Sequence, residues 1–223
     1  MVDMPKSTLL RLLNTMKAYN WVRQNSSTKR FSLGLGLVAL GKAAEKSFDM
    51  AGVMHSFLVD LTEKTGETTS LAMLEGDKPV NADHVVSKNM IRGEPRVGLV
   101  LALHCSAGGK MLLSAMDDEK IERIIERQGL KQKTAKTITD REVLKNEIHK
   151  IRERGYAVAD EEFVEGGRSI AAPIKDNEGQ VVAAISVMGP STRIRQEDLG
   201  EISTIVKDVA SKASAALGFT SLE

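Results

Sequence analysis

The chain has 223 residues, of which 42% are hydrophobic and 27% charged, values typical of a globular protein with one or two domains. No apolar run approaches the roughly 18 residues of a membrane-spanning helix, and we expect neither a membrane anchor nor export. A single cysteine, Cys105, excludes an internal disulfide framework and suits a reducing cytosol, so a cytoplasmic protein is predicted.

The net charge of +1 is unevenly distributed along the chain. Residues 1–42 contain seven Lys or Arg against one acid, a net charge of +6, whereas the remainder carries −5. A basic N-terminal segment followed by a mildly acidic remainder indicates contact with an anionic polymer such as double-stranded DNA. A small basic segment without such a partner has the same composition, so charge alone leaves both interpretations open.

A first helix is predicted to begin at Pro5, which suits the first helical position because its missing N–H needs no partner there. Its apolar residues recur at helical spacing: Leu9, Leu12, Leu13 and Met16. Polar residues near its start lie largely on the other faces, where a DNA-recognition helix contacts base edges: Lys6, Ser7, Thr8 and Arg11. Three residues precede Met4, so the helices that hold such a recognition helix are expected to be missing.

A β-hairpin is predicted next, with strands at residues 21–24 and 29–33 around a turn-rich stretch at 25–28. Arg23, Lys29 and Arg30 flank its tip, where basic side chains can contact phosphates. A plain solvated hairpin explains these charges almost as well. Helix and hairpin together are more specific than either, and they predict a partial winged helix over residues 1–34.

A linker helix is predicted over residues 35–49, followed by a stronger helix over 50–65 that ends at Gly66. The remaining chain mixes strands and helices on a mainly antiparallel plan, which predicts an α+β domain over residues 50–223 with a central sheet. The strands are expected at residues 68–74, 78–89, 96–103, 156–159, 169–174 and 181–188, and the helices at 107–115, 117–127, 140–154 and 196–217.

Several short motifs occur in a fixed order along almost the whole chain, among them Pro5-Lys6-Ser7-Thr8, Arg30-Phe31-Ser32-Leu33-Gly34, Thr65-Gly66-Glu67-Thr68, Leu103-His104-Cys105-Ser106-Ala107-Gly108-Gly109-Lys110, Gly167-Arg168-Ser169-Ile170-Ala171-Ala172-Pro173 and Ala183-Ala184-Ile185-Ser186-Val187-Met188-Gly189-Pro190. In this ordered set the chain resembles the IclR family of bacterial transcription regulators. The resemblance implies a winged helix-turn-helix, a linker helix and a GAF-like effector domain that binds a small metabolite, often a carboxylate or an aromatic compound. It also implies homodimers or homotetramers that repress or activate nearby catabolic operons.

A candidate anion site lies at residues 106–110, which open a helix after an apolar strand. The exposed N–H groups of a helix start, together with the positive end of its dipole, favour a carboxylate. The run fails the test for a phosphate loop because Met111 follows Gly109-Lys110 and position 104 is His. Small residues that merely permit close helix–sheet packing are the alternative interpretation.

The resemblance extends this site to facing strands of the effector domain. It implies that the ligand contacts Ser106, Ala107, Gly108 and Gly109 in the loop and Ser169, Ser186 and Met188 on later strands. Strand alternation puts Ser186 and Met188 on one face; ordinary strand packing is the alternative for these positions. Two departures from the family pattern, Ala159 in place of an acid and Met188 in place of a serine, make the pocket more apolar and favour an aromatic acid over a very small keto acid.

Metal, cofactor and enzyme chemistry find little support in the sequence. No second cysteine accompanies Cys105, and the remaining histidines lack ligand spacing, so no metal and no cofactor are expected. Cys105 is either a buried small residue or, near a helix start, a reactive thiol. Glu161 and Glu162 are interpreted as part of a solvated loop.

The leading prediction is therefore a ligand-responsive transcription regulator that is not an enzyme. In this hypothesis the ligand biases the placement of the effector domains and so resets the spacing of the recognition helices. The alternative is a sensing or hetero-oligomerising module that does not itself bind DNA.

Overall fold

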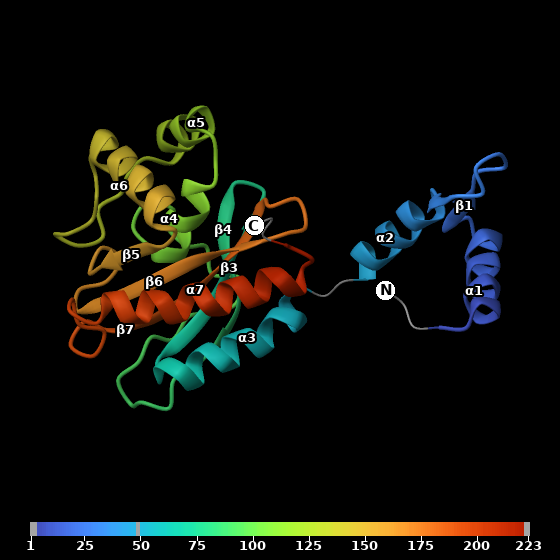
Figure 1. Cartoon of the computed structure of the whole chain (residues 1–223). Coiled ribbons are helices and arrows are strands. Elements are labelled where there is room, and N and C mark those ends of the chain that lie inside the picture. The colour runs from blue at the N-terminus through green and yellow to red at the C-terminus, as the bar shows by residue number, and fades with distance from the viewer. Residues whose placement is uncertain (1–3, 48–49, 221–223) are drawn as a thin grey trace. The chain divides into compact units, whose positions relative to one another are not determined.

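The computed structural model describes residues 4–47 and 50–220. The chain divides into two compact units, Met1–Met50 and Ala51–Glu223, each with its own internal contacts (Figure 1).

The first unit contains the predicted helix and hairpin. Helix α1 (Lys6–Ala18) is followed by β1 (Val22–Gln24) and β2 (Phe31–Leu33), which pair antiparallel, and then by α2 (Gly36–Ser47). Pro5 lies one residue before the helix, at the N-cap, rather than at the first helical position. At the hairpin tip the Asn25 side-chain oxygen accepts hydrogen bonds from two backbone N–H groups, those of Ser27 and Thr28, at 2.9 and 2.8 Å.

Two glycines fix the junction between α1, the hairpin and α2. The Gly34 N–H donates to the Trp21 carbonyl at 2.8 Å, and the Gly36 N–H donates to the Asn20 carbonyl at 2.9 Å. A Cβ atom on Gly34 would lie 2.1 Å from the Asn20 carbonyl oxygen. Glycine is therefore required where the end of β2 crosses the end of α1.

No residue of α1 is buried. The apolar stripe predicted from the sequence is present, but Leu9, Leu12 and Met16 are 40%, 46% and 39% exposed. Within the described residues of the first unit, no layer covers this stripe.

The second unit is built on a five-stranded sheet in the order β4-β3-β7-β6-β5, with every neighbouring pair antiparallel. Its strands are β3 (Thr68–Glu75), β4 (Lys78–Val85), β5 (Ala157–Asp160), β6 (Gly167–Lys175) and β7 (Val181–Pro190). This arrangement confirms the predicted α+β class with a mainly antiparallel sheet.

The strand predicted over residues 96–103 is wrong. Only an isolated bridge joins Val100 to Val80, although backbone hydrogen bonds tie this segment to Pro79 and Asn81. Gly98 adopts a positive φ of 77°, which breaks the extended conformation before a ladder can form. Strand β4 likewise ends at Val85, before the predicted end at residue 89, because Ser87 turns away to bond the Gly66 carbonyl through its hydroxyl.

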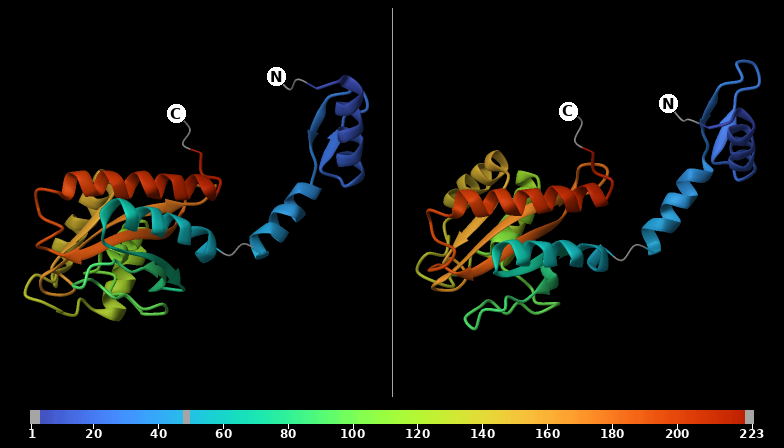
Figure 2. Two further views of the ribbon diagram at one scale, coloured as in Figure 1. Left: turned by 90° about the horizontal axis from the view of Figure 1, so that it is seen from below. Right: turned by 60° about the horizontal axis from the view of Figure 1, so that its bottom comes forward.

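Helices cover both faces of the sheet, as Figures 1 and 2 show. Helices α3 (Met50–Thr65) and α7 (Leu199–Ala216) lie side by side on one face. The other face carries α4 (Ala107–Ser114), with α5 (Asp118–Gln128) and α6 (Arg141–Arg154) further out. Caps predicted from the sequence are present: Gly66 and Gly155 have positive φ, and the Asp140 side chain accepts from the Val143 N–H.

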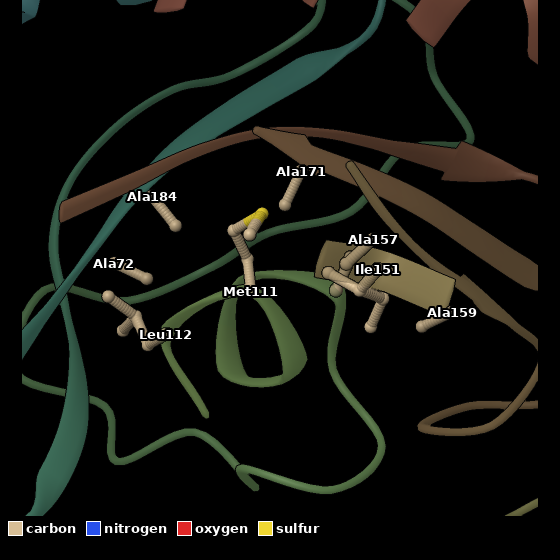
Figure 3. Close-up of a cluster of buried hydrophobic side chains, with 9 residues drawn as sticks. Ala72, Met111, Leu112, Ile151, Ala157, Ala159, Ala171 and Ala184 are labelled. Carbon is tan, nitrogen blue, oxygen red and sulfur yellow. The ribbon is translucent and has the colours of Figure 1, made fainter. Parts of the chain in front are cut away.

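Each face of the sheet has its own core. Under α3, the side chains of Met54, Leu58 and Leu61 are completely buried. Under α4, Met111 points towards small strand residues, including Ala171 and Ala184, as Figure 3 shows. Small side chains let the start of α4 approach the sheet so closely that a Cβ on Gly108 would lie 3.0 Å from the Cβ of Ala72.

Candidate functional site

Helix α4 begins with two unpaired backbone donors. The Ser106 hydroxyl caps the helix by accepting from the Gly109 N–H at 3.1 Å and donates to the Ala102 carbonyl at 2.7 Å. The Lys110 N–H donates a hydrogen bond to the Ser106 carbonyl. The N–H groups of Ala107 and Gly108 have no acceptor among the described residues, so they are available to an anion at the positive end of the helix.

Ala107 and Gly108 both line a cavity of about 440 Å³. The cavity lies between the start of α4, one end of the sheet and two loops, at residues 91–101 and 163–167. Its volume lies within the range of small-molecule sites, which are roughly 300–1,000 Å³. The cavity is therefore large enough for a small organic molecule.

The sheet supplies a wall of short polar side chains. Ser70 and Ser186 stand opposite each other on β3 and β7, and their hydroxyl oxygens are 2.9 Å apart. One step along, Ser169 of β6 stands opposite Met188 of β7. Ser70 is not among the site residues predicted from the sequence. Its place in the site follows from the strand register that aligns it with Ser186, and a single sequence does not reveal that register.

The rest of the wall is largely apolar. One loop contributes Ile91, Leu99 and Leu101, and the other contributes Phe163 and Val164. Ala159 and Met188, the two departures from the family pattern, also line the cavity. The Met188 sulfur lies close to the first loop, since a Cβ on Gly93 would be 3.0 Å from it.

Six of the seven predicted ligand contacts line this cavity: Ser106, Ala107, Gly108, Ser169, Ser186 and Met188. Gly109 does not. Its N–H is used by the Ser106 cap, and a Cβ there would lie 2.5 Å from the Ala102 carbonyl oxygen and 2.8 Å from the Leu103 Cα. Position 109 is a glycine because the preceding turn packs closely against it. For this residue, close packing rather than ligand binding therefore explains the small side chain.

Cys105 and Glu162 are both buried near the start of α4. Burial, and secondly the neighbouring Glu162 carboxylate, raise the pKa of the Cys105 thiol to about 11, which opposes a reactive thiolate. The interpretation of Glu162 as solvated is wrong: this residue is 8% exposed and forms an ion pair with the buried Lys110 at 2.6 Å. Residue type alone suggested solvent exposure, because a charged side chain is almost never buried without a partner.

The predicted DNA contacts all lie in the first unit. Lys6, Ser7 and Arg11 are exposed on α1, and Thr8 is half-buried. Arg23 is exposed on β1 and donates to the Ser32 hydroxyl at 3.1 Å, while Lys29 and Arg30 are exposed at the hairpin tip. The structure thus gathers basic side chains on two neighbouring elements of one unit.

No metal-ligating cluster and no membrane-spanning helix occurs within residues 4–47 and 50–220. Within these ranges no group of three or more His, Cys, Asp or Glu side chains is arranged to hold a metal ion. No helix there has the length and hydropathy needed to cross a membrane.

Comparison with known proteins assigns the chain to a family. Residues 42–215 match the family model described as bacterial transcriptional regulator IclR C-terminal. The chain is 36% identical over 217 residues to the HTH-type transcriptional repressor AllR of Escherichia coli K12. The aligned region covers 97% of this chain and 80% of that protein.

Solved structures agree with this assignment. The crystal structure of Thermotoga maritima IclR is 31% identical, with a TM-score of 0.73 over 97% of this chain and 87% of that one. The Agrobacterium tumefaciens repressor BlcR, at 23% identity, shares the fold with a TM-score of 0.83 over 99% of this chain and 87% of that one. The chain therefore belongs to the IclR family of bacterial transcription regulators, whose members respond to ligands and bind DNA.

Proposed function

We propose that the cavity of the second unit binds an organic acid with a carboxylate and a larger apolar body, such as an aromatic acid. The observation that carries this proposal is the pair of free N–H groups on Ala107 and Gly108, at one end of a largely apolar cavity. The carboxylate is held by these donors and the helix dipole, and the body packs against Phe163, Leu99 and Met188.

A panel of acids tests the ligand class. Benzoate and phenylacetate are expected to raise the melting temperature of the chain, and the neutral analogue benzamide is not. Stabilisation by glyoxylate or pyruvate but by no aromatic acid would refute the aromatic assignment.

Ala107→Pro tests the donors themselves. Ala107 is the first residue of α4, where proline is tolerated, and Ser106 already has the extended backbone that precedes proline. Loss of one hydrogen bond to a charged group is expected to weaken benzoate binding by about tenfold or more. Ala107→Val adds similar bulk but keeps the N–H, so an equal loss in both variants would show that the donor is not used.

We further propose that the first unit binds double-stranded DNA through Lys6, Ser7, Thr8 and Arg11 of α1 and through Arg23, Lys29 and Arg30 of the hairpin. All of these side chains except the half-buried Thr8 are exposed, and the first 42 residues carry a net positive charge, which supports this proposal. The resemblance to repressors such as AllR supports a homodimer or homotetramer in the cytoplasm, and light scattering on the purified chain measures its oligomeric state.

A second candidate function is a sensing or hetero-oligomerising module that does not bind DNA by itself. The exposed stripe of Leu9, Leu12 and Met16 favours it, since a recognition helix must be held by packing. Binding to promoter DNA at several salt concentrations separates the two candidates. DNA binding predicts an affinity that falls with salt, with a slope reduced by about 0.9 for each phosphate contact removed in Lys29→Gln or Arg30→Gln.

A further inference from the structure

Lys110 is an unusual residue for the interior of a domain. It lies in α4, one turn after the free N–H groups, and its side chain is 1% exposed. Its ammonium is 2.6 Å from a carboxylate oxygen of Glu162 and 3.5 Å from one of Glu147 on α6. Arg154 also pairs with Glu147, at 2.8 Å, so two cations face two carboxylates.

Glu162 belongs to a rim loop, residues 161–166, that borders the cavity through Phe163 and Val164. Polar contacts fix both ends of this rim loop. The carbonyls of Glu161 and Glu162 accept from the hydroxyls of Thr134 and Thr137, at 2.7 and 2.6 Å. At the far end, the Glu161 carboxylate accepts from the Gly166 N–H at 2.9 Å.

Stability alone does not explain a buried ion pair. Removing two charges from water costs several kcal/mol for each ion, and replacing such pairs with well-packed apolar residues is often neutral or stabilising. The second oxygen of Glu162, Oε2, has no hydrogen-bond partner among the described residues, and burial raises the pKa of this carboxyl. What the pair does provide is a fixed geometry between two segments that both line the cavity.

We propose that Lys110 and Glu162 are positioning residues of the effector site. Their ion pair joins α4, which presents the anion-binding N–H groups, to the rim loop, which presents Phe163 and Val164 to the body of the ligand. The spacing between the carboxylate end and the apolar end of the site is thereby set before the ligand binds. This inference rests on the proposed function for its ligand.

The test uses Glu162→Gln and a double variant, Lys110→Met with Glu162→Met, in the full chain. The double variant removes both charges, so it regains the thermal stability that the single variant loses. If the pair positions the rim, both variants show faster amide exchange at Glu161 and Gly166 without ligand, and both bind benzoate about tenfold or more weakly.

Lys136→Met is the matched control. Lys136 pairs with Glu161 of the same rim loop at 3.0 Å, but half of its side chain is exposed, so its loss is expected to change benzoate affinity less than about threefold. Unchanged rim exchange in Glu162→Gln, or a double variant that regains stability, slow exchange and affinity together, would overturn the positioning role. Failure of the wild-type chain to bind benzoate and related acids would instead overturn the proposed function, while the exchange measurement still decides whether the pair holds the rim.

Discussion

Helices α1 and α3 carry apolar residues at the same spacing in different surroundings. In α3, the side chains of Met54, Leu58 and Leu61 are fully buried against the sheet, and α7 lies alongside. In α1, Leu9, Leu12 and Met16 remain about two-fifths exposed, because the adjoining hairpin has strands of only three residues. An amphipathic stripe stabilises a fold only in proportion to the surface that another layer removes from water.

The largest expected effect is a loss of unfolding free energy in the buried stripe of α3, for which the exposed stripe of α1 is the comparison. Leu58→Ala should lower the free energy of unfolding by about 2–5 kcal/mol, because it leaves a cavity under α3. Leu12→Ala should change it by less than about 0.5 kcal/mol, as surface substitutions do. Urea unfolding measures both; equal losses would show that α1 is as well packed as α3.

The next effect concerns the tightness of the second unit. Gly109→Ala places a methyl group against backbone atoms of residues 102 and 103 that cannot move aside easily. It should cost about 1–3 kcal/mol of unfolding free energy. Gly41→Ala is the control in the first unit, since a Cβ there meets no atom within 4 Å, and it should be neutral or slightly stabilising.

The pH dependence of the unfolding free energy measures how well the second unit excludes water from the Cys105 thiol. Burial raises the pKa of this thiol from 9.0 to about 11, so the folded chain keeps a proton that the unfolded chain releases. The resulting stabilisation is complete below pH 9 and declines as pH rises towards 11. Relative to Cys105→Ala, the wild-type chain should lose about 1 kcal/mol between pH 8 and pH 10 in urea unfolding. A constant difference would mean that water reaches the thiol.

The smallest effect lies in the exposed unit. Asn25→Ala removes two side-chain hydrogen bonds at the hairpin tip, worth about 0.5–1 kcal/mol locally. Trypsin cleavage after Lys29 or Arg30 should accelerate about two- to fivefold, because cleavage follows the population of the open hairpin. Cleavage after Lys207, in α7, serves as the internal reference and should not change.

Local patterns in the sequence predict most elements of both units. The spacing of Met54, Leu58 and Leu61, together with Gly66, suffices for α3. The 96–103 segment has a strand composition, but the backbone conformation of Gly98 decides otherwise, and composition does not reveal a positive φ.

The candidate site divides in the same way. The start of α4 and the alternation of Ser186 and Met188 are local features, and the sequence predicts both. Ser70 and Glu162 enter only through contacts across 116 and 52 residues of chain, which depend on strand register and on the path of the rim loop. Such pairings are set by the whole packed domain, so a single sequence does not reveal them.

The glycine junction of the first unit has a mechanical consequence. The Trp21 and Asn20 carbonyls accept hydrogen bonds from Gly34 and Gly36, the residues that lead into α2. The end of α1, the hairpin and the start of α2 therefore meet at one hydrogen-bonded junction. These backbone hydrogen bonds hold α1 and the hairpin in one orientation relative to the start of α2. A side chain at position 34 would clash with the Asn20 carbonyl and disrupt this arrangement.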